Sequence, residues 1–167
     1  VTVCDGNGTD YHCTVSDAAP GQISLVVHEQ EPSRAEPGVF CRVYMAFAKA
    51  EKLEHVIQKA TELGACEIIA FPSSRCVAKP DEKSLSKKLE RWQKIAASAA
   101  EQSGRGRIPA VRTAKSFREA VLEASKSDLP LFPYENEKTL PLSACLKAGV
   151  YKTVSIMTGP EGGFSED

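Results

Sequence analysis

The sequence from Lys49 to Phe71, KAEKLEHVIQKATELGACEIIAF, decides the fold because a helical pattern and a strand pattern follow each other in it. Apolar residues recur at positions i, i+3, i+4 and i+7 from Leu53, and Gly64 then ends the pattern, as glycine often ends a helix. The apolar run at residues 66–71 follows directly and predicts a buried strand. A helix that leads straight into a buried strand is typical of α/β proteins.

The alternation of helices and strands continues to the C-terminal end of the sequence. Ser116 and Glu119 form a capping box, which predicts the start of a helix. Helices are predicted over about 83–103, 116–125 and 142–147, and strands over about 108–112, 129–132 and 153–158. Residues 48–167 therefore predict an α/β domain with a mainly parallel sheet.

Residues 1–47 show the period-two alternation of β-strands instead. The turn-forming sequences DGNG at 5–8 and PG at 20–21 separate short strands, and another strand is predicted over about 40–47. Several short strands in so few residues fit a small barrel, or part of one, with a domain boundary near residue 47. Because the first residues already lie in a strand pattern, we expect that an upstream segment is missing.

The composition is that of a globular protein: of 167 residues, 42% are hydrophobic and 26% are charged. The apolar runs are much shorter than the roughly 20 residues that a membrane-spanning helix needs, and no signal sequence precedes them. We therefore expect a cytoplasmic protein without a membrane partner. The six cysteines are far apart and form no C-x-x-C pair or cluster with histidine, so we expect reduced thiols and no metal site.

Charge is distributed unevenly along the chain. Residues 1–40 contain one basic and six acidic side chains, whereas residues 41–127 contain 17 basic and 10 acidic ones. A polyanionic partner would therefore meet the middle of the chain. The alternative is that these basic side chains only solvate exposed helix faces and bind no partner.

Two stripes of basic side chains on the predicted helices favour a polyanion. Within each stripe the residues are three, four or seven positions apart, which places them on one helix face. Arg75 follows a strand, and Glu101 and Arg105 lie at a helix end; arginine can grip phosphate with two hydrogen bonds. The stripes consist of Lys49, Lys52 and Lys59 on the first helix and Lys87, Arg91 and Lys94 on the second.

The most distinctive segment, Gly159 to Phe164 (GPEGGF), directly follows an apolar strand. Ligands of open α/β sheets bind at the carboxyl ends of strands, and glycines let the backbone approach a ligand closely. The segment matches neither the dinucleotide-binding nor the phosphate-binding glycine motif. It is either one wall of a ligand pocket or a tight turn. Residues 131–135 (LFPYE), at another strand end, would form the facing wall.

Five segments stand out in order along the chain: Lys52 to Gly64 (KLEHVIQKATELG), Ser74-Arg75, Arg91 to Ala96 (RWQKIA), Ala100 to Arg105 (AEQSGR) and Gly159 to Phe164 (GPEGGF). Together they resemble the ribosomal RNA small-subunit methyltransferase E family, which consists of SPOUT-class enzymes, and the resemblance covers the whole chain. It implies a homodimer that uses S-adenosylmethionine to methylate N3 of one uridine in 16S rRNA of the small ribosomal subunit.

For the fold, the resemblance implies a PUA-like β-barrel that binds RNA, here residues 1–47, and a SPOUT-type α/β domain with a trefoil knot, here residues 48–167. Family members continue beyond the GPEGGF segment with residues that thread the knot and close the cofactor pocket. Because this sequence stops at Asp167, we expect an incomplete knot and half a cofactor site. This polypeptide alone would then bind S-adenosylmethionine weakly or not at all.

The resemblance also implies roles for the candidate residues. Arg75 and Arg105 would stabilise negative charge on the uracil oxygens. Glu101 would accept the N3 proton or hold one of these arginines in place. The two basic stripes would contact RNA phosphates, and Glu161 would orient the cofactor or only the loop. The cofactor would lie against Gly159, Glu161, Gly162 and Gly163, opposite Leu131 and Glu135.

Two other functions stay open at this point. A non-catalytic RNA-binding or assembly module would also carry a basic surface and an incomplete cofactor site. A SPOUT methyltransferase with another rRNA target would share the fold and the cofactor.

Overall fold

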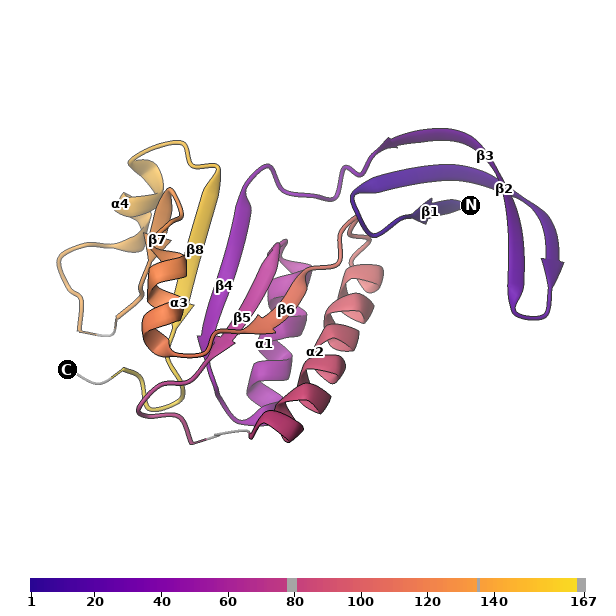
Figure 1. Cartoon of the computed structure of the whole chain (residues 1–167). Helices are drawn as coiled ribbons and strands as arrows, with labels where there is room; N and C mark the ends of the chain where they lie inside the picture. The colour runs from indigo at the N-terminus through magenta and orange to yellow at the C-terminus, as the bar shows by residue number, and fades with distance from the viewer. Residues whose placement is uncertain (78–80, 135, 165–167) are drawn as a thin grey trace.

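The computed structural model describes residues 1–77, 81–134 and 136–164. These residues form two parts, an antiparallel sheet at the N-terminus and an α/β part that holds the later elements. Figure 1 shows the antiparallel sheet projecting from one side of the α/β part.

The antiparallel sheet consists of β1 (Thr2–Cys4), β2 (Thr9–Ala19) and β3 (Gln22–Pro32), in that order. The prediction of β structure for the first residues is thus confirmed. In the described part of the chain the sheet is open, so its closure into a barrel stays a prediction.

In the described ranges the second sheet has five strands, and every neighbouring pair is parallel. The predicted α/β domain with a mainly parallel sheet is therefore confirmed. The strand order is β6-β5-β4-β8-β7. The strands are β4 (Phe40–Ala46), β5 (Glu67–Phe71), β6 (Ala110–Thr113), β7 (Leu129–Leu131) and β8 (Thr153–Thr158).

The central strand β4 corrects the sequence analysis, which assigned residues 40–47 to the barrel. It pairs with β5 on one side and β8 on the other, and Tyr44 and Ala46 within it are buried. A domain boundary near residue 47 is therefore wrong for this strand, because the α/β part already begins at Phe40.

Among the described residues, four helices connect the parallel strands. α1 and α2 pack against each other on one face of the sheet, and α3 covers β4, β5 and β8 on the other face (Figure 1). The Ser116 side chain accepts a hydrogen bond from the N–H of Glu119, which confirms the predicted helix start. No described helix is both long and apolar enough to span a lipid bilayer. The helices are α1 (Ala50–Glu62), α2 (Glu82–Gln102), α3 (Phe117–Ala124) and α4 (Leu142–Lys147).

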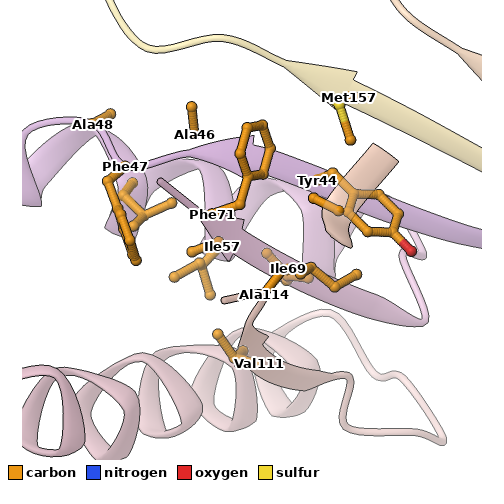
Figure 2. Packing of buried hydrophobic residues seen from close by; sticks show 14 of the residues in the cluster. Tyr44, Ala46, Phe47, Ala48, Ile57, Ile69, Phe71, Val111, Ala114 and Met157 are labelled. Carbon is orange, nitrogen blue, oxygen red and sulfur yellow. The ribbon is translucent and has the colours of Figure 1, made fainter. Parts of the chain in front are cut away.

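The hydrophobic core lies on both faces of the parallel sheet. Figure 2 shows side chains of β4 and β5 packed together with Ile57 of α1 and Met157 of β8. Residues 68–71 of β5 are all at most 1% exposed. Because helices cover both faces of this strand, its sequence is a continuous apolar run rather than an alternation.

We expect Leu53→Ala to lower the free energy of unfolding by about 2–5 kcal/mol, since the lost methyl groups leave a cavity in the core. Leu53 is 1% exposed and lies on α1. The matched control is Leu122→Ala on α3, where the leucine is 56% exposed and the change should stay within about 0.5 kcal/mol. Urea denaturation measures both, and equal losses would contradict this description of the core.

Candidate functional site

The strands β4 and β8 are neighbours in the parallel sheet, although β5, β6 and β7 come between them in the chain. From β4 the chain runs through α1 to β5 and then to β6 on one side of the sheet, whereas β8 and β7 lie on the other side. Ligands of open α/β sheets bind outside the carboxyl ends of strands. The segment Gly159 to Phe164, here called the glycine loop, begins directly after β8.

The backbone of the glycine loop folds back on itself. The N–H of Gly163 donates to the carbonyl oxygen of Pro160 at 2.9 Å, and Gly163 has a φ of +67°, which favours glycine. A Cβ atom on Gly159 would lie 3.0 Å from the carbonyl carbon of Gly163. The tight turn considered in the sequence analysis is therefore present, and it favours glycine at both positions.

Glu161 ties the glycine loop to the start of α1. Its carboxylate accepts a hydrogen bond at 3.0 Å from the backbone N–H of Lys49, the N-cap residue of α1, and lies 3.6 Å from Nζ of Lys52. The Lys49 side chain makes no capping hydrogen bond of its own. The Lys49 N–H, with a smaller contribution from the Lys52 charge, holds the pKa of Glu161 below its ordinary value. Glu161 therefore holds the loop in place.

Arg75 lies beside the glycine loop, in the segment that follows β5. Its Nη1 donates to the carbonyl oxygen of Gly162 at 2.9 Å. A Cβ atom on Gly162 would lie 3.7 Å from the Arg75 side chain, so the two residues are in van der Waals range. Because Arg75 is exposed, its guanidinium group also faces the solvent next to the loop.

Aromatic rings connect the glycine loop to the segment after β7. The ring of Phe164 packs 4.4 Å from that of Phe132 and 5.6 Å from that of Phe117, measured between centroids. Leu131 and Phe132 also line a small apolar pocket of about 100 Å³. The structure thus brings the predicted facing wall to the loop for residues 131 and 132, whereas Glu135 lies outside the described residues.

Arg105 lies at the other end of the parallel sheet. Its Nη1 donates to the carbonyl oxygens of Thr61 and Ala65, so it lies before the amino end of β5, whereas Arg75 follows the carboxyl end of the same strand. Its side chain is only 3% exposed and pairs with Glu36. Within this chain Arg75 and Arg105 therefore lie at opposite ends of β5, and their shared role at one nucleotide stays a prediction for the full enzyme.

Glu101 is also far from the glycine loop. It is exposed near the C-terminal end of α2, a helix of 21 residues that is about 30 Å long. Together with Lys94 and Asp10 it lines a groove of about 840 Å³ between α2 and the antiparallel sheet. Within one chain, Glu101 therefore cannot accept a proton from a base held at the loop.

The two basic stripes differ in how strongly their side chains are already paired. Lys59 pairs with Glu62 at 2.7 Å, Arg91 pairs with Glu54 at 2.7 Å, and Lys52 pairs more loosely with Glu161. Three further members of the stripes are exposed and form no ion pair with any described residue: Lys49, Lys87 and Lys94. These three are the most available for phosphate groups.

Comparisons with known proteins match the whole length of this chain. Residues 36–167 match the family model of the RNA methyltransferase domain. The ribosomal RNA small subunit methyltransferase E of Bacillus subtilis is 33% identical over 171 aligned positions, which cover 99% of this chain and 67% of that protein. The chain belongs to the ribosomal RNA small subunit methyltransferase E family.

Other members of the methyltransferase E family match this chain over a similar length. The protein from Mycobacterium bovis is 34% identical over 98% of this chain and 63% of its own length. The crystal structure of the family member from Neisseria gonorrhoeae, bound to S-adenosyl methionine, has a TM-score of 0.82 and 25% identity, and the match covers 99% of this chain and 67% of that one. The chain thus spans about two thirds of the length of the relatives it matches.

The sequence analysis missed two residues that hold other parts of this chain in place. Glu36 pairs with the buried Arg105, and Phe164 joins the glycine loop to the core. The sequence around Glu36 does not indicate its partner, because Arg105 lies 69 residues away. The apolar Phe164 directly after two glycines was a usable signal for a residue that fixes the loop.

We expect Glu161→Gln to lower the melting temperature at neutral pH, because an amide is a weaker partner for the positive end of α1 and for Lys52. Since folding depresses the pKa of Glu161, its carboxylate stabilises the fold above the ordinary value of 4.5. That contribution is lost as the pH falls through the lower folded-state pKa. The difference in melting temperature between wild type and variant should therefore shrink below pH 4.5, and calorimetry across the acidic range measures it.

Glu90→Gln is the matched control for this experiment. Glu90 is exposed on α2, and its side chain has no hydrogen bond or ion pair with the described residues. Its replacement should leave the melting temperature unchanged at every pH. The stabilising contact of Glu161 with the start of α1 would be refuted if Glu161→Gln also left the melting temperature unchanged at every pH.

Proposed function

We propose that this protein transfers a methyl group from S-adenosylmethionine to N3 of a uridine in the 16S rRNA of the small ribosomal subunit. Membership of the RNA methyltransferase family supports the reaction class. The observation that carries the proposal for this chain is the glycine loop, which leaves the carboxyl end of β8 beside β4 and is fixed to α1 by Glu161.

The glycine loop fits a cofactor that is bound through backbone groups. Gly159, Gly162 and Gly163 carry no side chains, so a cofactor can approach their backbone closely. Leu131 offers apolar surface for the adenine ring, and Glu161 keeps the loop in position. Glu135 belongs to the same proposed wall but lies outside the described residues. When bound, S-adenosylmethionine supplies the electrophilic methyl group.

Arg75 is the proposed catalytic residue of this chain. Uracil N3 becomes a good nucleophile only after it loses its proton, and the resulting negative charge is shared with the uracil oxygens. A guanidinium group beside the cofactor wall stabilises that charge. The hydrogen bond from Arg75 to Gly162 supports this role, because it fixes the guanidinium at the loop where the base must approach.

RNA phosphates are proposed to bind along the two basic stripes. Lys49, Lys87 and Lys94 have no carboxylate partner among the described residues and would contact phosphates directly. The other members, Lys52, Lys59 and Arg91, would exchange a carboxylate for a phosphate, at the cost of an existing ion pair. We further propose that the full-length protein acts as a homodimer in the cytoplasm, as the resemblance to the family implies.

Methyl transfer from labelled S-adenosylmethionine to isolated small ribosomal subunits tests the proposal in the full-length protein. We expect label in 16S rRNA, and mass spectrometry of digested rRNA should place it on uridine N3. Label on another nucleotide would support a different rRNA target. RNA binding without any transfer would support a non-catalytic module and contradict the proposed reaction.

Gly159→Ala should weaken S-adenosylmethionine binding about tenfold or more, because the new Cβ would push the backbone of Gly163 out of position. The matched control is Gly38→Ala, since a Cβ there would meet nothing within 4 Å. Isothermal titration calorimetry on the full-length protein measures both affinities. If the two variants bind the cofactor equally well, the glycine loop is not the cofactor wall.

Lys87→Ala and Lys94→Ala should each reduce the slope of log K against log salt concentration for RNA binding by about 0.7–0.9, as expected for one lost phosphate contact. Lys126→Ala, at an exposed lysine just after α3 on the opposite face of the sheet, is the control and should leave the slope unchanged. Filter binding at several salt concentrations provides the slopes. An unchanged slope for Lys87→Ala and Lys94→Ala would remove both residues from the RNA interface.

A further inference from the structure

The antiparallel sheet meets the α/β part mainly through one loop. The helices and strands of the α/β part make few direct contacts with β1, β2 and β3. Instead, residues 104–108, which follow α2, contact both the turn between β1 and β2 and the linker between β3 and β4. Figure 1 shows this loop at the place where the sheet leaves the rest of the molecule.

Arg105 is the centre of this connection. Its Nη1 donates to the carbonyl oxygens of Thr61 at 3.1 Å and Ala65 at 2.6 Å, at the end of α1. Its Nε and Nη2 donate to the two carboxylate oxygens of Glu36 at 3.2 Å and 2.7 Å, so the pair is bidentate. Glu36 also accepts the backbone N–H of Arg107 at 3.0 Å. The linker is thereby fixed to the α/β part.

Gly106 brings the sheet into direct backbone contact with the same loop. Its carbonyl oxygen accepts the N–H of Gly8 at 2.7 Å and the thiol of Cys4 at 3.1 Å. A Cβ atom on Gly106 would lie 2.2 Å from Cβ and 2.5 Å from Oγ of Ser33. The loop and the linker are therefore too close for any side chain at position 106.

The chemistry of these contacts makes them rigid. A buried arginine that loses its carboxylate partner keeps an uncompensated charge in a poorly solvated place, which is strongly unfavourable. The five hydrogen bonds of Arg105 and Arg107 to Glu36, Thr61 and Ala65 also have fixed directions. The antiparallel sheet consequently has one favoured orientation relative to the α/β part.

We propose that Glu36, Arg105 and Gly106 form an orientation latch that fixes the antiparallel sheet beside the basic stripe of α2, so that the sheet bounds the path of the RNA substrate. The inference rests on the proposed function. The basic stripe of α2 ends at Lys94, which lines the groove whose other wall includes Asp5 and Asp10 of the antiparallel part. The carboxylates of Asp5 and Asp10 repel RNA phosphates, so they keep an RNA chain on the stripe. The latch sets how close this acidic wall lies to the stripe. In this latch Arg105 is accordingly a positioning residue.

Gly106→Ala in the full-length protein tests the latch, because the new Cβ would collide with Ser33. We expect small-angle X-ray scattering to show a broader distribution of interatomic distances. The KM for small ribosomal subunits should rise about tenfold, which corresponds to about 1.4 kcal/mol. The dissociation constant for S-adenosylmethionine and the far-UV circular dichroism should stay unchanged, because the glycine loop lies at the other end of the sheet.

Ser33→Gly supplies the matched rescue. The Ser33 hydroxyl is buried and has no hydrogen-bond partner in the described part of the chain, so this change alone should be nearly silent. In the double variant Gly106→Ala/Ser33→Gly the space for the new Cβ is restored. We expect the double variant to recover both the wild-type scattering curve and the wild-type KM.

A second variant covers the case in which Gly106→Ala fails to fold. Glu36→Gln keeps the shape of the side chain and removes the charge that pairs with Arg105, so it should broaden the scattering distribution and raise the KM in the same direction.

Several results would overturn the latch: a wild-type KM in both variants, a raised KM with an unchanged scattering curve, or a parallel loss of S-adenosylmethionine affinity. Absence of methyl transfer in the wild type would instead refute the proposed function, and the scattering data alone would then decide on the latch.

Discussion

The hydrogen bond between Glu161 and the N–H of Lys49 joins two segments 112 residues apart, and the candidate site depends on it. It forms because β4 and β8 are neighbours in the sheet, so the start of α1 and the glycine loop emerge side by side. The positive end of α1 favours a carboxylate there. The same helix end carries Lys52, so the proposed cofactor wall and the first basic stripe are mechanically connected. A change in the loop is therefore expected to reach the surface that is proposed to meet RNA.

Local periodicity was sufficient to predict most of the fold. The helical spacing of α1 and the continuous apolar run of β5 are properties of short segments, and each element formed where its pattern lies. β4 was assigned to the wrong sheet for a physical reason. Alternation of side chains arises in any strand, and only the pairing partners distinguish an antiparallel edge from the centre of a parallel sheet. Those partners, β5 and β8, lie far along the chain.

The candidate site was predictable only where its chemistry is local. The glycine loop could be recognised from its composition, and its position after a strand indicated a ligand-binding edge. The role of Arg105 could not be predicted, because its carboxylate partner is 69 residues away. Its burial also depends on how α1 and β5 are joined. The basic stripes were recognised from spacing, yet the pairing of Arg91 with Glu54 on another helix required the packing of α1 against α2.

Hydrogen exchange in the full-length protein, with and without S-adenosylmethionine, tests most directly whether the loop and the helix end act as one wall of the cofactor site. We expect the cofactor to slow exchange in two peptides together, the one covering the glycine loop and the one covering the first turn of α1. Protection confined to other segments, with these two peptides unchanged, would contradict the account.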